Sequence, residues 1–158
     1  NLSSAEKELK EIEKLRTNKN VEELIIWEIN SAGILIKIAY EVLSGEIAAK
    51  NTNYNAAIAH LKKAVELEYT LRYDEPPTWF YPCSQNLGAV LIEAGKYAEA
   101  EKVYLKNLED VPENGWSLFG LHQSVLKQNR IDEAGEIQKR FNEAWKNADV
   151  ILTSSRIM

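Results

Sequence analysis

The sequence predicts an all-α protein built from antiparallel helix pairs, and three observations support this class. The apolar residues follow the helical period of 3.6, similar residues recur 34 positions apart, and only 7 glycines and 4 prolines occur among 158 residues. That number of turn residues is too small for a loop-rich β sandwich or a disordered chain. With 45% hydrophobic residues, the chain is long enough to bury one core without disulfides or metals.

Residues 1–30 are expected to form a helical N-terminal extension. Residues 3–15 place Glu and Lys three and four positions apart, which is typical of a solvated helix face with favourable charge pairs. Residues 21–29 contain a β-branched and aromatic cluster that would also suit an extended segment. We expect a helix there because the surrounding segments are helical.

The first predicted helix pair joins residues 31–50 to residues 54–71. It contains the most apolar stretch of the chain, which is interrupted by Lys37 and is far shorter than the roughly 20 residues that span a bilayer. We therefore expect a buried helix and no membrane insertion. The second helix of the pair carries an apolar stripe at the 3.6 period, and Glu68 is the one polar residue on it. The stripe comprises Tyr54, Ala57, Ile58, Leu61, Ala64 and Val65.

Two further pairs are predicted, residues 79–94 with 97–110 and residues 115–128 with 131–147. Gly95 and Asn129 lie between the helices of these pairs, where a left-handed residue can end the first helix. Small residues, Ala100 and Ala134, follow at positions where two helices can approach closely. Residues 150–158 are expected to be a frayed or docking tail.

The segment that joins the first two pairs contains Pro76 and Pro77. Two successive prolines break a helix, and we expect them to place Trp79, Phe80 and Tyr81 at the start of the next helix.

These pairs form a repeat. Ala100 recurs as Ala134 at the 34-position spacing, and the first unit aligns with the second at a longer spacing. In that alignment Gly45, Tyr54 and Ala57 match Gly88, Tyr97 and Ala100 without a gap. The middle unit carries Leu87, Gly88, Leu91, Gly95, Tyr97, Ala100, Tyr104 and Pro112. This pattern resembles the tetratricopeptide repeat (TPR). The resemblance implies helix pairs stacked in a right-handed α-α superhelix over residues 31–149, with three repeats at about 31–77, 78–113 and 114–148.

Two short motifs refine the resemblance. Residues 73–79 read Tyr-Asp-Glu-Pro-Pro-Thr-Trp, and residues 114–118 read Asn-Gly-Trp-Ser-Leu. Both are similar to the C-terminal repeats of a group of bacterial TPR proteins. The similarity implies no particular biochemical role.

In TPR folds the first helix of each pair lines a concave surface that takes an extended peptide or a partner helix. Carried over to this chain, the lining positions are Ala39, Val42, Glu46, Ala49, Lys50, Pro82, Gln85, Asn86, Ala89, Ile92, Glu93, Trp116, Phe119, Gln123, Leu126 and Lys127. We take eight of them as the predicted partner-binding residues: Glu46, Gln85, Asn86, Ile92, Trp116, Phe119, Gln123 and Lys127.

The identity of the lining residues limits the kind of partner. The TPR subset that grips an acidic C-terminus needs Lys, Asn and Arg at several lining positions, and only Asn86 fits, which disfavours that function. Two roles remain open for Trp116 and Phe119. They could anchor a partner, or pack against the segment around Trp79 or against the final helix.

No catalytic motif occurs in the sequence. It lacks His-Glu-x-x-His, Gly-x-Ser-x-Gly, a Gly-rich phosphate loop and Cys-x-x-Cys. We therefore predict no enzymatic activity, no cofactor and no metal site. His60 and His122 are far apart in the sequence and are interpreted as structural. Cys83, the single cysteine, is interpreted as an inert packing group. Asp74 and Glu75 are expected to cap exposed helix starts by accepting hydrogen bonds from backbone amides.

The function we expect is a protein-interaction scaffold that forms the C-terminal part of a longer TPR protein. Its partner would be a protein or peptide, and self-association is one form this could take. A net charge of −5 argues against nucleic acid as the partner. A cytoplasmic location is favoured over a periplasmic one, although a signal before Asn1 would not be visible.

Two alternatives stay open. One is a small-ligand or metal-dependent activity in a pocket near Tyr73, Asp74, Glu75, Trp79 and His122. The other is a purely structural role as the cap of a longer solenoid.

Overall fold

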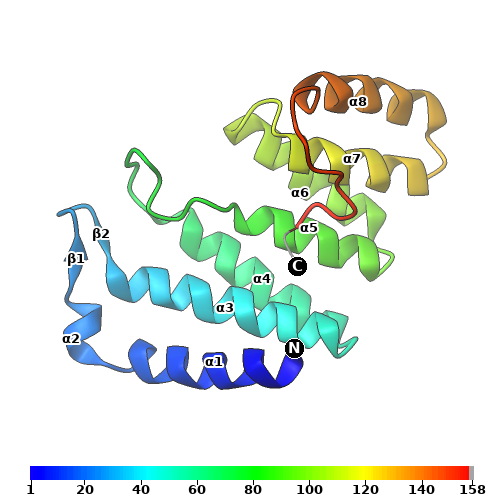
Figure 1. The fold of residues 1–158 in the computed structure, drawn as a ribbon. Helices are drawn as coiled ribbons and strands as arrows, with labels where there is room; N and C mark the ends of the chain where they lie inside the picture. The colour runs from blue at the N-terminus through cyan, green and yellow to red at the C-terminus, as the bar shows by residue number, and fades with distance from the viewer. Residues whose placement is uncertain (157–158) are drawn as a thin grey trace. The chain divides into compact units, whose positions relative to one another are not determined.

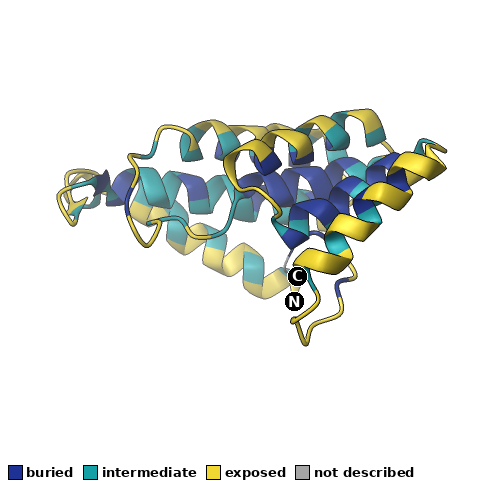
Figure 2. Ribbon diagram, turned by 90° about the horizontal axis from the view of Figure 1, so that it is seen from above, coloured by how far each residue is buried: buried dark blue, intermediate teal, exposed yellow. Residues whose placement is uncertain are grey.

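The computed structural model describes residues 1–156, which are helical apart from loops and one short β hairpin (Figure 1). The all-α prediction is therefore confirmed. Internal contacts divide the chain into two compact units, Asn1–Cys83 and the residues from Ser84 onward. Within the described residues, no helix is both long enough and apolar enough to cross a membrane. Figure 2 shows buried residues along the helices and exposed residues mainly at their outer faces and in the loops.

Three long helices build the first unit: α1 (Leu2–Arg16), α3 (Ala32–Lys50) and α4 (Tyr54–Glu68). Helix α3 packs against both α1 and α4 (Figure 1). Leu61 of α4 is fully buried, as the apolar stripe predicted, and Ile38 is fully buried in the apolar stretch of α3. The guanidinium of Arg16 lies 4.5 Å from the centre of the Tyr40 ring and joins α1 to α3.

Between α1 and α3 the predicted helix over residues 21–29 is wrong. A single helical turn is followed by a two-stranded antiparallel hairpin in which Ile25 pairs with Ser31 and Ile26 with Asn30. The elements are α2 (Lys19–Glu22), β1 (Ile25–Ile26) and β2 (Asn30–Ser31). Trp27 and Glu28 reverse the chain with φ values of 50° and 61°.

A tertiary contact of Asn30 explains the hairpin. The Asn30 side chain is buried; its Nδ2 donates to the Arg72 carbonyl at 2.9 Å, and its Oδ1 accepts from the Arg72 amide at 2.8 Å. These bonds tie the hairpin to a loop that is distant in the sequence. A local sequence pattern cannot reveal them, so the β-branched cluster carried the only sign of an extended segment.

The next helix, α5 (Cys83–Glu93), begins later than predicted. Trp79, Phe80 and Tyr81 precede it in non-helical conformation, which corrects the expectation that they open the helix. Pro82 explains the difference, because a proline disfavours helical geometry in the residue before it. The first amide of α5 is satisfied from α4, since the Glu68 carboxylate accepts from the Cys83 N–H at 2.8 Å. This bond accounts for the polar residue on the apolar stripe.

The second unit contains α5 and three further helices: α6 (Tyr97–Asp110), α7 (Gly115–Lys127) and α8 (Ile131–Ala144). Helix α7 packs against α6 and α8. The bounds of α6 match the prediction, whereas α8 ends slightly earlier than expected, at Ala144.

The turns inside the helix pairs confirm the spacing of the repeat. Thr52, Gly95 and Asn129 have φ values of 58°, 74° and 62°, and each stands at the same place in its unit. In each turn the next amide bonds back to the preceding helix. The bonds are Asn53 to the Ala48 carbonyl, Lys96 to Leu91 and Arg130 to Val125. The predicted small residues Ala57, Ala100 and Ala134 each follow such a turn at the same interval, and all are buried.

Close packing in the second unit centres on Tyr104, which is fully buried. A Cβ atom added to Gly88 would lie 2.3 Å from the Tyr104 Cζ atom, and one added to Gly120 would lie 2.2 Å from it. The ring of α6 therefore packs directly on the backbones of α5 and α7. In the first unit, a Cβ added to Gly45 would lie 2.6 Å from the Cγ atom of Leu61.

The substitution Gly88→Ala tests this packing. The new methyl group must displace a buried ring, so we expect the free energy of unfolding to fall by about 1 to 3 kcal/mol. The midpoint of thermal unfolding, followed by circular dichroism, should fall by about 2 to 12 °C.

Gly135→Ala is the matched control, because an added Cβ there meets no atom within 4 Å. Since Gly135 lies inside α8, alanine should stabilise the protein by up to about 1 kcal/mol. Equal shifts in the two variants would contradict the close packing of Gly88.

Candidate functional site

Predicted lining positions of α5 and α7 border one cavity in the second unit. It has a volume of about 230 Å³ and is lined by Ala89, Ile92 and Glu93 of α5, Gln123 of α7, and residues 153–155. We call it the α5–α7 pocket. The structure thus brings together Ile92 and Gln123, two of the predicted partner-binding residues.

Two other predicted residues lie in the interior. Gln85 and Asn86 are only 2% and 3% exposed, which leaves little of either side chain for a partner to contact. The Gln85 Nε2 atom donates to the Asn114 Oδ1 atom at 3.0 Å, and the same oxygen caps α7 by accepting from the Ser117 amide. Gln85 therefore joins α5 to the start of α7.

Trp116 and Phe119 pack against the final helix, which is the second of the two roles considered for them. The Trp116 ring meets Trp145 edge to face at 5.8 Å between centres, and Phe119 meets Phe141 at 5.7 Å. Phe141 stacks on Trp145 at 5.9 Å. Trp116, Phe119, Phe141 and Trp145 are all half-buried. They form an aromatic cluster between α7 and α8 whose remaining surface faces solvent.

The other predicted positions lie outside the pocket. Glu46 is half-buried on α3 of the first unit, and Lys127 is exposed at the last position of α7. Pro82, one of the wider set of lining positions, precedes α5 and is not part of a helix.

Residues 152–156 are docked rather than frayed. Leu152, Ser155 and Arg156 are buried, and the Ser155 Oγ lies 2.5 Å from the Tyr104 hydroxyl. The Arg156 Nη2 donates to the Glu93 Oε1 at 2.7 Å. The last two residues of the predicted tail, 157–158, lie outside the described residues. We refer to residues 152–156 as the C-terminal segment.

Sequence reasoning left docking and fraying open because the C-terminal segment carries no periodic pattern. Its partners, Tyr104 and Glu93, are both distant in the sequence.

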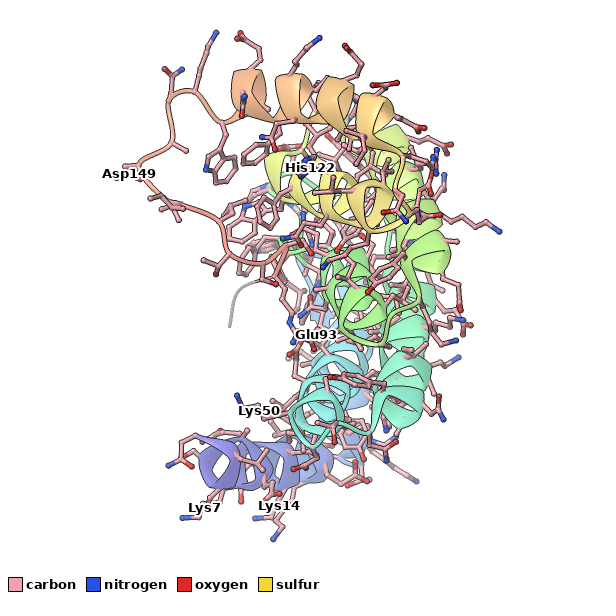
Figure 3. All side chains as sticks on the ribbon, turned by 90° about the vertical axis from the view of Figure 1, so that its right-hand side faces the viewer. Lys7, Lys14, Lys50, Glu93, His122 and Asp149 are labelled. Atoms are coloured by element: carbon pink, nitrogen blue, oxygen red, sulfur yellow. The ribbon has the colours of Figure 1, made fainter. Side chains whose placement is uncertain are left out.

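The alternative pocket is only partly assembled. Tyr73, Asp74 and Trp79 line a pocket of about 310 Å³ in the first unit, together with Asn30 and other residues of the loop. Glu75 does not line it, and His122 lies on α7 in the second unit (Figure 3).

The two adjacent carboxylates of this loop have different partners. Asp74 accepts from both the amide and the hydroxyl of Thr78, so it bonds to a backbone amide as predicted, but in a loop and not at a helix start. The Glu75 carboxylate instead accepts from the Tyr73 hydroxyl at 2.6 Å, which corrects the capping role expected of it. This hydrogen bond raises the pKa of Tyr73 and disfavours its ionised form.

The histidines occupy different environments. The His60 Nδ1 atom lies 2.6 Å from a carboxylate oxygen of Glu41, in a pairing between α4 and α3. Burial lowers the pKa of His122 and favours its neutral form. Across residues 1–156, no three His, Cys, Asp or Glu side chains gather in a group that could hold a metal ion.

Cys83 is fully buried in the core of the first unit beside Ile38 and Ala64. Burial raises the pKa of its thiol well above the usual range, and the negative charge of Glu68 adds to the effect. Both causes oppose the thiolate that a cysteine nucleophile requires.

No protein-family model matches the sequence, and no curated protein matches it. Among solved structures, the chain is similar to one titled "Crystal structure of MamA protein", with a TM-score of 0.58 and 16% sequence identity. MamA is a helical repeat protein of the TPR type. The chain has a TPR-like fold. The match covers 77% of this chain but 65% of MamA, less than two-thirds of its length. At this identity the likeness concerns the fold alone.

The buried thiol leads to a labelling prediction. At pH 8, Cys83 in the folded protein should react with a disulfide reagent at least about a hundredfold more slowly than in urea, because it is inaccessible and protonated. Release of the coloured thiol product measures both rates.

A control separates burial from reagent failure. In a Cys83→Ala background, Lys139→Cys places a thiol at a highly exposed position of α8 and should react at the ordinary rate. Rapid reaction of Cys83 in native buffer would contradict the inert role.

Proposed function

We propose that this chain is a protein-interaction module that binds an extended polypeptide at the α5–α7 pocket, with Ile92 and Gln123 in contact with it. The TPR-like fold favours an interaction scaffold over an enzyme, since such folds offer long helical surfaces and no preformed catalytic site. The proposed partner is a protein or peptide, as expected from the sequence.

The observation that carries the proposal is the exposure and hydrogen bonding of the Gln123 side chain. Its side chain is half-exposed, lines the pocket, and makes no hydrogen bond within residues 1–156. An uncommitted amide offers donors and an acceptor, which is the chemistry that pairs with the backbone of an extended peptide.

The rest of the pocket supplies complementary chemistry. Ile92 and Ala89 give an apolar floor for side chains of a ligand, and the exposed Glu93 carboxylate at the rim, which accepts from Arg156, is a place for a cation. A mixed pocket of this kind suits a polypeptide better than a purely apolar ligand.

The other predicted binding residues take supporting roles in this proposal. Trp116 and Phe119 position α7 through their rings, while Lys127 and Glu46 remain candidates for charges outside the pocket. Replacing Trp116 would disturb the packing of α8, so Gln123 is the better position for a binding test.

The test begins with a library of random extended peptides selected against the full chain. For the selected peptides, Gln123→Arg should weaken binding at least about tenfold, because the larger cation fills the pocket and removes the free amide. Fluorescence anisotropy measures the affinities, and circular dichroism confirms that the variant is folded.

Gln138→Arg is the matched control, since Gln138 lies on α8 and bonds to Asn142 outside the pocket. The Gln138→Arg variant should bind the selected peptides with the same affinity as the wild type. The proposal fails when no peptide is enriched, or when the two variants bind the selected peptides equally well.

A further inference from the structure

We propose that the C-terminal segment is a displaceable wall of the α5–α7 pocket and that it competes with an external polypeptide of the same chemistry for this surface. That chemistry is an extended chain with Leu, Ser and Arg at its first, fourth and fifth positions. The inference rests on the proposed function, to which it adds the recognised pattern and a means of regulation.

The position of the segment is the first argument. Residues 153–155 line the pocket together with Ile92 and Gln123, the two residues to which we assign partner binding. The Ser155 Oγ also lies 3.4 Å from the Gln85 carbonyl oxygen of α5. The segment therefore forms one wall of the pocket, on surface of α5 and α7 that an extended ligand of the proposed site would also use.

The segment buries some of its side chains and leaves others accessible, as a bound peptide does. Ser155 and Arg156 are only 1% and 7% exposed, and Leu152 is also buried, whereas Thr153 is exposed and Ser154 is half-buried. The segment is neither helix nor strand, and three of its side chains are buried against the rest of the protein.

Charge complementarity defines one position of the pattern. The Arg156 guanidinium is almost fully removed from solvent and donates to Glu93, the carboxylate at the pocket rim. Displacing the segment takes this cation away from the Glu93 carboxylate, so a competing chain needs a cation at the same place to replace the ion pair.

The attachment of the segment is light enough for displacement. Of the described backbone-to-backbone hydrogen bonds, none joins residues 152–156 to a helix, so docking depends on side chains. The preceding residues 146–151 are all exposed, with Ile151 at 91%, and Asp149 lies in this connection (Figure 3). The connection can move away without exposing buried surface of its own.

Incomplete filling favours a competitor. The 230 Å³ of the pocket remain free beside residues 153–155, so the segment does not pack fully against Ile92 and Gln123. A chain with larger side chains at these places would gain contacts that the segment lacks. Because the segment belongs to the same chain as the pocket, its effective concentration there is on the order of millimolar, which favours it over a free competitor.

The experiment uses the full chain and a fluorescent peptide with the sequence of residues 150–156. In the wild type the tethered copy competes, so the peptide binds weakly. Arg156→Glu places a carboxylate against Glu93 and releases the segment, and the peptide should bind at least about tenfold more tightly. Leu152→Asp should release the segment by a second route and give the same gain.

Two further measurements establish the specificity. Arg140→Glu removes an exposed ion pair with Glu113 outside the pocket, and it should bind the peptide as weakly as the wild type. The Glu93→Arg variant should reverse the preference for the last residue of the peptide. It should bind a peptide that ends in Glu more tightly than the original peptide, which ends in Arg. Circular dichroism confirms the fold of each variant.

The outcomes separate this inference from the proposed function. Equal binding by the wild type and both released variants, or no binding to any of them, overturns the inference. When peptides from the random library still bind at Gln123 in that case, the proposed function stands alone. When those peptides also fail, both are wrong.

Discussion

The contact of the Tyr104 ring with two glycine backbones is the constraint on which the second unit depends. Gly88 of α5 and Gly120 of α7 leave no room for a Cβ atom, so both helices approach the ring directly. Their separation is thereby set by the thickness of one aromatic side chain. The Tyr104 hydroxyl emerges beside Ser155, so the same residue that spaces the helices also binds the C-terminal segment. The packing of the helices and the docking of the C-terminal segment thus share one side chain.

The first unit uses the same arrangement with a different result. Gly45 faces Leu61, and these two residues occupy the places in the repeat that Gly88 and Tyr104 occupy in the second unit. Leucine fills the space between the helices but carries no polar group. The tyrosine of the second unit adds a buried hydroxyl, which must find a partner because an unpaired buried polar group is unfavourable. The polar contact therefore occurs in the second unit, because a tyrosine stands there at the place where the first unit has a leucine.

Where sequence and structure agree, the relevant forces are local. The left-handed conformation of Gly95 and Asn129 and the bounds of α6 follow from residues within one turn of helix. Of the candidate site, Ile92 and Gln123 were named because they stand at positions that line the concave surface in the TPR family, which the sequence resembles, and both line the pocket. The departures have distant causes: the hairpin depends on the bond of Asn30 to Arg72, and the late start of α5 is stabilised by Glu68 of α4.

The sequence by itself therefore determined the helices, their turns and the spacing of the pairs, since these depend on backbone propensities and on the 3.6-residue period. Tertiary structure alone decided that Gln85 is buried, that the aromatic rings of α7 pack on α8, and that the C-terminal segment is docked. Each of these requires chain segments far apart in sequence to meet at hydrogen-bonding or van der Waals distance. No local pattern encodes such a meeting, because it becomes favourable only after the helices have packed and excluded water from the site.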